Sequence, residues 1–120
     1  YIQQANDEVV VVVQAEHAQA VENIKAIATT PGVDGVFIGP YDLSASLGKM
    51  GQLDDPAVIK AIEHIAQTCL AAGVKLGVFT TSAEAAKPYI ERGFTLITAG
   101  TDTLSLGQGG RDIVGEIKGL

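Results

Sequence analysis

The sequence predicts an α/β fold built on a parallel sheet. Short apolar runs alternate with helical stretches along the whole 120-residue chain, which gives four consecutive strand-then-helix units. Such units place their strands parallel and connect them by right-handed crossovers. The 14 glycines indicate many tight turns between strands and helices. No linker, charge block or residue-level repeat divides the chain, so we expect residues 1–120 to form a single unit.

The first unit contains five consecutive valines at residues 9–13. A β-branched run without polar alternation is typical of a strand buried on both faces, and we expect that strand within residues 8–14. Residues 18–29 are predicted to form a helix, because apolar side chains recur there at spacings of three and four. The Thr-Thr-Pro-Gly segment at 29–32 ends this helix.

The second unit begins with Gly-Val-Phe-Ile at residues 35–38, which predicts a short strand. A long loop over residues 39–56 follows this strand. The next helix has Asp54 or Asp55 as its N-cap, accommodates Pro56 in its first turn and ends at Gly73.

The last two units repeat the pattern. Residues 74–79 predict the third strand, and Ser82 caps a helix that ends at Gly93 and that Pro88 is expected to kink. Residues 94–99 predict the fourth strand. A final helix begins at Thr101 or Asp102, runs toward Leu120 and is expected to be irregular around the glycines of residues 107–110.

The valine strand is not explained by a self-sufficient sheet of four strands. If strand order follows chain order, residues 9–13 lie at one edge, without a charge, proline or bulge to protect it. Closing a barrel takes about eight strands. We therefore expect half of a (β/α)8 barrel, completed by an N-terminal half or by a partner chain. The alternative is a small doubly wound sheet with helices over both faces.

Composition narrows the class of protein. The formal charge of −6 argues against nucleic-acid binding, which needs a basic surface. The single cysteine, Cys69, rules out an internal disulfide framework and is predicted to be a buried, inert thiol. No apolar stretch reaches the roughly 18–20 residues of a membrane span, and the first residues lack the pattern of a signal peptide. These features lead us to expect a cytoplasmic protein without a membrane partner.

Candidate site residues follow the first two predicted strands, and chemistry in parallel α/β folds gathers at this end of the sheet. The first strand leads into Gln14, Ala15, Glu16 and His17, and the second leads into Gly39, Pro40, Tyr41 and Asp42. Neighbouring strands lie about 4.8 Å apart, so Glu16 and Asp42 can converge on one ion. Two carboxylates that leave positions for water and substrate suit Mg²⁺ or Mn²⁺. The turn at Gly39 and Pro40 would also let backbone amides approach an anion.

Simpler interpretations of these acids stay open at this point. Asp42 could cap a short turn over residues 43–47, and Glu16 could interact with the dipole of the following helix. Asp34 lies at the wrong end of its strand for catalysis. We expect capping or solvent exposure for His17 and a surface or packing position for His64; Asp102 is expected to cap the last helix. The glycines of residues 107–110 lack the strand-then-helix context of a dinucleotide-binding loop.

The segments Val-Gln-Ala-Glu at 13–16 and Gly-Val-Asp-Gly-Val-Phe-Ile-Gly-Pro-Tyr-Asp-Leu-Ser at 32–44 carry a resemblance. The sequence resembles the HpcH/HpaI aldolase family of 4-hydroxy-2-oxoheptanedioate and 2-keto-3-deoxy-sugar-acid aldolases. The similarity also extends over Ala-Ala-Gly-Val-Lys-Leu-Gly at 71–77 and over residues 93–102. By this resemblance the chain is the C-terminal half of a TIM-type barrel, with strands 5–8.

The resemblance implies a metal-dependent, class II aldolase, a lyase that splits a keto acid into pyruvate or a related keto acid and an aldehyde. Glu16 and Asp42 would be the metal ligands for Mg²⁺ or Mn²⁺, with Co²⁺ also possible. Gln14 would be a catalytic residue that holds the keto oxygen. The segment of Gly39, Pro40, Tyr41 and Asp42 would bind the substrate, with the amides of Tyr41 and Asp42 on its carboxylate.

The chain departs from the family pattern in one respect. The family's basic histidine and enolate-stabilising arginine lie in the first half of the barrel, and His17 and Arg111 do not sit in matching motifs. We therefore expect the missing base and arginine to come from another polypeptide. As partners of the chain we expect a second copy in a homo-oligomer or a complementing N-terminal half-barrel. Two other functions stay open: a non-catalytic half-barrel that binds metal and keto acids or serves in assembly, and a lyase like the citrate-lyase β-subunit.

Overall fold

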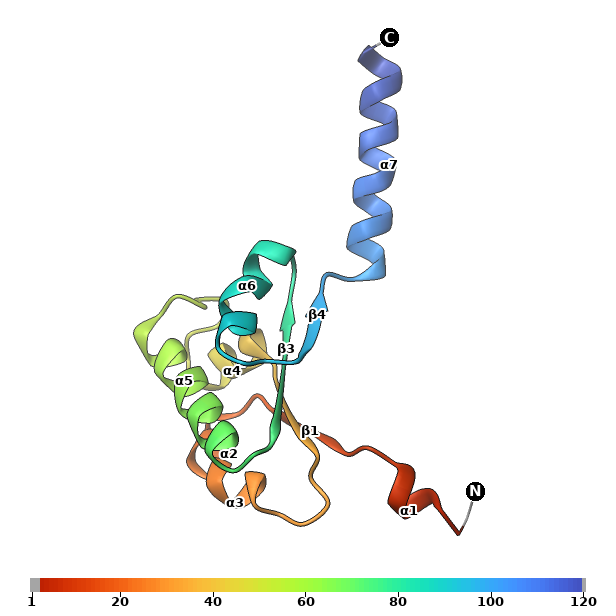
Figure 1. Cartoon of the computed structure of the whole chain (residues 1–120). Coiled ribbons are helices and arrows are strands. Elements are labelled where there is room, and N and C mark those ends of the chain that lie inside the picture. The colour runs from red at the N-terminus through yellow and green to blue at the C-terminus, as the bar shows by residue number, and fades with distance from the viewer. Residues whose placement is uncertain (1–2, 120) are drawn as a thin grey trace.

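The computed structural model describes residues 3–119, and the predicted α/β class is confirmed. Four strands form one sheet in the order β1-β2-β3-β4, and every neighbouring pair is parallel (Figure 1). The strands are β1 (Val12–Ala15), β2 (Gly35–Ile38), β3 (Lys75–Thr80) and β4 (Leu96–Ala99). Strand order follows chain order, so β1 and β4 are the edges of the sheet.

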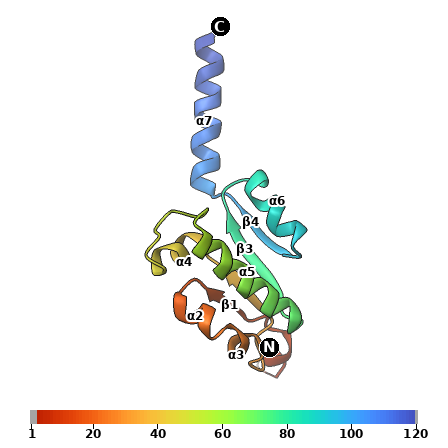
Figure 2. The same cartoon turned by 90° about the vertical axis from the view of Figure 1, so that its left-hand side faces the viewer.

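Seven helices connect or flank these strands in the described part of the chain. They are α1 (Ala5–Glu8), α2 (Ala18–Glu22), α3 (Ile24–Ala28), α4 (Pro40–Ser46), α5 (Pro56–Ala71), α6 (Ala83–Glu91) and α7 (Asp102–Gly119). Helices α2 to α6 lie on one side of the sheet, whereas α7 runs away from it (Figures 1 and 2). None of the helices among residues 3–119 is long and apolar enough to span a membrane.

The hydrophobic core lies between the sheet and these helices. Val36, Ile38, Leu76 and Val78 face the helices and are at most 1% exposed. They pack with the buried face of α5, which contributes Val58, Ala61, Ile62, Ile65, Ala66 and Cys69. Because side chains alternate along a strand, the intervening residues lie on the opposite face. That face has no covering layer among the described residues, and Leu96 on it is 49% exposed.

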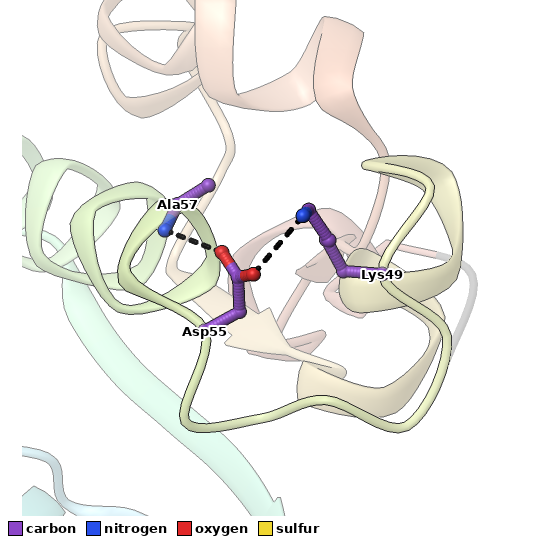
Figure 3. Close-up of polar contacts among 3 residues, drawn as sticks. All are labelled: Lys49, Asp55 and Ala57. Atoms are coloured by element: carbon purple, nitrogen blue, oxygen red, sulfur yellow. Dashed lines mark hydrogen bonds and ion pairs between the residues drawn. The ribbon is translucent and has the colours of Figure 1, made fainter.

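Two predicted helix caps are confirmed. The Ser82 side chain accepts a hydrogen bond from the Ala85 amide and begins α6. Asp55 begins α5: its Oδ1 accepts from the Ala57 amide at 2.8 Å and its Oδ2 lies 3.2 Å from the Lys49 ammonium (Figure 3). The Ala57 hydrogen bond and then Lys49 hold the pKa of Asp55 below its ordinary value.

The expected bounds of the valine strand were wrong. Strand β1 begins only at Val12, and Val9 to Val12 are 42–72% exposed, not buried on both faces. The strand pairing with β2 does not extend back to Val11, because Asp34 forms hydrogen bonds with both backbone groups of Val11. Its Oδ2 accepts from the Val11 amide at 2.7 Å, and its own amide donates to the Val11 carbonyl at 2.9 Å.

Two helix predictions also need correction. The helix expected over residues 18–29 is divided at Asn23 into α2 and α3. The last helix, by contrast, is continuous through the glycines of residues 107–110, where Gln108 hydrogen-bonds Asp112 and Arg111 within the same helix. Helix α7 has no buried residue, and Leu120 lies outside the described residues. Pro88 lies inside α6, which continues to Glu91.

Candidate metal and keto-acid site

The carboxyl ends of β1 and β2 lie side by side. Their last residues, Ala15 and Ile38, are paired in the sheet. Glu16 and Gly39 follow directly on these two strands, so the sheet register alone brings them next to each other. Gln14 lies two residues before Glu16, and the alternation of side chains along a strand places both on the same side.

Two of the predicted site residues are in direct contact. The Nε2 atom of Gln14 donates a hydrogen bond to Oε2 of Glu16 at 2.8 Å. Gly39 borders the same oxygen so closely that an added Cβ would lie 2.7 Å from it and 3.6 Å from Gln14 Nε2. Gln14 is exposed and Glu16 is half-buried, so the pair is accessible from the uncovered face of the sheet.

The second predicted carboxylate lies on α4. This helix has Gly39 as its N-cap residue and starts at Pro40, so Asp42 lies in its first turn and does not cap residues 43–47. Pro40 has no amide hydrogen, and the Leu43 amide donates to the Gly39 carbonyl at 2.9 Å. Tyr41 and Asp42 lie between Pro40 and Leu43 in the first turn of α4. A helix supplies no backbone acceptor for amides at these positions.

Two serines to which the sequence analysis assigned no role fix this helix. Ser44 is fully buried, and its Oγ donates to the Tyr41 carbonyl at 2.6 Å and accepts from the Gly51 amide at 3.0 Å. Ser46 Oγ accepts from the Ala18 amide at 3.0 Å, which ties α4 to the start of α2, just after Glu16. In the sequence, the two serines of the Asp-Leu-Ser-Ala-Ser run were the signal for these roles. Their hydrogen-bond partners Ala18 and Gly51 depend on the fold and could not be predicted.

The remaining candidates have structural roles. His17 caps α2, because its Nδ1 accepts from the Gln19 amide at 3.2 Å. His64 is exposed on α5. Thr101 Oγ1 accepts from the Leu104 amide at 3.3 Å, at the start of α7, where Asp102 is the first residue. Cys69 is fully buried, as predicted, and burial raises the pKa of its thiol to about 11.

The residue types at this edge of the sheet suit a hard divalent cation. Among residues 3–119 no group of three or more His, Cys, Asp or Glu side chains is arranged to hold a metal. Two carboxylates with water and substrate in the other positions are the usual protein environment of Mg²⁺, which keeps several waters and binds through one or two carboxylates. The absent side chain at Gly39 leaves the space that Oε2 of Glu16 occupies.

Fold and site together define a class: a parallel α/β unit of the barrel type, with its polar residues at the carboxyl ends of the strands. The model of the HpcH/HpaI aldolase/citrate lyase family matches residues 1–108. The chain therefore belongs to the HpcH/HpaI family, as its sequence predicted, and its four strands are half of a TIM-type barrel.

Individual relatives support this assignment. A 5-keto-4-deoxy-D-glucarate aldolase from Escherichia coli is 42% identical over 102 residues, which are 85% of this chain and 40% of that protein. The crystal structure of a family protein from Burkholderia cenocepacia superposes with a TM-score of 0.93 at 41% identity, over 98% of this chain and 46% of that one. An HpcH/HpaI aldolase from Desulfitobacterium hafniense gives a TM-score of 0.87 at 36% identity, over 99% and 46%. The chain thus spans less than half the length of these relatives.

Proposed function

We propose that the chain forms the metal- and keto-acid-binding half of a divalent-metal-dependent aldolase. The reaction is carbon–carbon cleavage of a 2-keto-3-deoxy or 4-hydroxy-2-oxo acid into pyruvate, or a related keto acid, and an aldehyde. The observation that supports this proposal best is the meeting of Gln14, Glu16 and Gly39 at the paired ends of β1 and β2. Family membership and the similarity to a 5-keto-4-deoxy-D-glucarate aldolase agree with it.

In this proposal Glu16 and Asp42 hold Mg²⁺ or Mn²⁺, with Co²⁺ as a further possibility. When bound, the ion acts as a Lewis acid on the keto oxygen and stabilises the negative charge that develops there during cleavage. Gln14 donates to the same keto oxygen, because its amide nitrogen carries two hydrogens and only one is used on Glu16.

The substrate carboxylate binds at the start of α4. The Tyr41 and Asp42 amides have no backbone acceptor within the helix, so they can donate to an anion. The buried Pro40 and Gly39 shape the turn that presents these amides. The acidic Asp42 side chain in the same turn would repel the anion unless a cation binds it, so substrate binding and metal binding are coupled in this site.

The proton-handling base and an arginine are expected from outside this chain, in a complementing N-terminal half-barrel. A homo-oligomer would cover the open edges of the sheet but would bring neither residue. This chain contains no motif that matches the base or the arginine of the family. Its relatives are about twice as long as the region that they share with it. A non-catalytic role in metal and keto-acid binding or in assembly is the second candidate function. The citrate-lyase-like alternative is covered by the same family name.

The test is an assay of the full gene product that contains this sequence. We expect it to release pyruvate from 5-keto-4-deoxy-D-glucarate or from a 4-hydroxy-2-oxo acid, to lose this activity in EDTA and to regain it with Mg²⁺ or Mn²⁺. Metal binding without turnover of any keto acid would favour the non-catalytic function. Cleavage that is unaffected by chelation would reject metal dependence.

A further inference from the structure

We propose that Gly39 and Gln14 are positioning residues that fix the Glu16 carboxylate for the metal, an inference that rests on the proposed function. Both residues act on one atom, Oε2 of Glu16. Gln14 donates a hydrogen bond to that oxygen at 2.8 Å, and Gly39 leaves the space that the oxygen occupies. The other carboxylate oxygen is then left to bind the cation.

Gly39 is required for space and not for backbone conformation. Its φ of −99° and ψ of 91° are accessible to residues with a side chain. A Cβ there would lie 2.7 Å from Oε2 and 3.3 Å from Cβ of Glu16. Since Oε2 is the end of a flexible side chain, alanine at this position would push the carboxylate aside and would not unfold the protein.

Gln14 lies on β1, two residues before Glu16, and holds the same carboxylate by its hydrogen bond to Oε2. A carboxylate that accepts a hydrogen bond from a fixed amide loses rotational freedom before the metal arrives, which strengthens metal binding. Gln14 is exposed, so its replacement removes this hydrogen bond without opening a cavity in the core. The second amide hydrogen remains available to substrate, which makes Gln14 a link between the metal ligand and the keto oxygen.

The experiment measures Mn²⁺ affinity and thermal unfolding of the full gene product and of its variants. We expect Gly39→Ala and Gln14→Met each to weaken Mn²⁺ binding by roughly 10–100-fold, the usual effect of losing a group that orients a metal ligand. The midpoint of thermal unfolding without metal should change little in either variant. Both effects should disappear in a Glu16→Gln background, where the carboxylate that they position is gone.

Gly77→Ala is the matched control. Its Cβ would lie 2.5 Å from Cδ2 of Phe37 and 3.1 Å from the backbone oxygen of Leu96, well away from Glu16. We expect this variant to lose thermal stability and to keep wild-type Mn²⁺ affinity in its folded state. Gly39→Ala and Gly77→Ala should therefore show opposite patterns in the two measurements.

The outcomes separate the inference from the proposed function. If the wild-type protein does not bind Mn²⁺, or if Glu16→Gln binds it as tightly as wild type, the metal site and this inference both fail. If Glu16→Gln weakens binding but Gly39→Ala and Gln14→Met bind like wild type, the positioning role is rejected and the metal site stands. Should Gly39→Ala fail to fold, Gln14→Met alone decides the same question.

Discussion

Gln14 of β1 and Phe37 of β2 are paired in the parallel sheet, and both side chains lie on the face that turns away from the helices. The same row continues through Gly77 of β3 to Leu96 of β4. Phe37 lies over Gly77, since a Cβ on that glycine would be 2.5 Å from the ring. This row has a polar residue beside the candidate site and apolar residues farther from it. Such a mixture is typical of the interior of a barrel.

This uncovered face and the exposed valines that precede and begin β1 predict that the isolated chain does not remain a monomer. Four valines, Val9 to Val12, and Leu96 are all more than 40% exposed. Full burial of each such side chain is worth about 1.5–3 kcal/mol. We expect light scattering to give the purified 120-residue chain a mass above 12.4 kDa, or the chain to need an N-terminal half-barrel for solubility. A concentrated, stable monomer with rapidly exchanging β1 amides would contradict this.

Asp42→Asn removes one of the two carboxylates proposed for the metal. We expect the variant to fold normally and to lose most metal-dependent cleavage, because one ligand charge in such a site stabilises the transition state by roughly 3 kcal/mol, or about 100-fold in rate. Asp34→Asn is the control. Asp34 directly precedes β2, whereas Asp42 follows its carboxyl end, so the two acids lie at opposite ends of this strand. Equal turnover by wild type and Asp42→Asn with saturating metal would remove Asp42 from the mechanism.

Asp55 should stabilise the fold in a pH-dependent way. Its pKa is lowered from the ordinary value of 3.8, chiefly by the Ala57 hydrogen bond, so its contribution is present above about pH 4 and is lost as the pH falls further. We expect Asp55→Ala to lower the midpoint of thermal unfolding by a few degrees at pH 7 and by less at pH 3. An equal loss from Asp54→Ala, the neighbouring acid, would show that the cap is not the cause.

Cys69 should be unreactive in the folded protein. Its pKa of about 11, against an ordinary 9.0, lowers the thiolate fraction by about 100-fold at neutral pH, and the side chain is fully buried. We expect thiol reagents to label it only as fast as the protein opens and to label it at once in denaturant. Rapid stoichiometric labelling of native protein at pH 7.5 would show that α5 does not pack as described.

The arrangement of the fold could be predicted because its signals are local. The second strand was placed at residues 35–38 and is found there, and the caps Asp55 and Ser82 depend only on the residues that follow them. The start of β1 could not be found from five identical valines. It is set by the contact of Asp34 with Val11, 23 residues away in the chain.

In the candidate site too, local features could be predicted from the sequence, whereas contacts between distant segments could not. Gln14 and Glu16 are two residues apart, a local spacing that suffices to put both side chains on one side of a strand, and the structure brings them into contact. The close approach of Gly39 to Glu16 depends on the register between β1 and β2, which no local pattern specifies. The roles of Ser44 and Ser46 were missed for the same reason, since the partners Gly51 and Ala18 lie in other segments.

Anomalous diffraction from crystals of the full gene product soaked in Mn²⁺ tests the proposed metal site most directly. We predict one strong manganese peak at the carboxyl ends of β1 and β2, about 2.0–2.2 Å from carboxylate oxygens of both Glu16 and Asp42. The two carboxylates should then lie within about 5 Å of each other, as ligands of one ion must. A peak elsewhere, or Glu16 and Asp42 pointing to opposite faces of the sheet with manganese present, would contradict the metal site and the proposed aldolase mechanism.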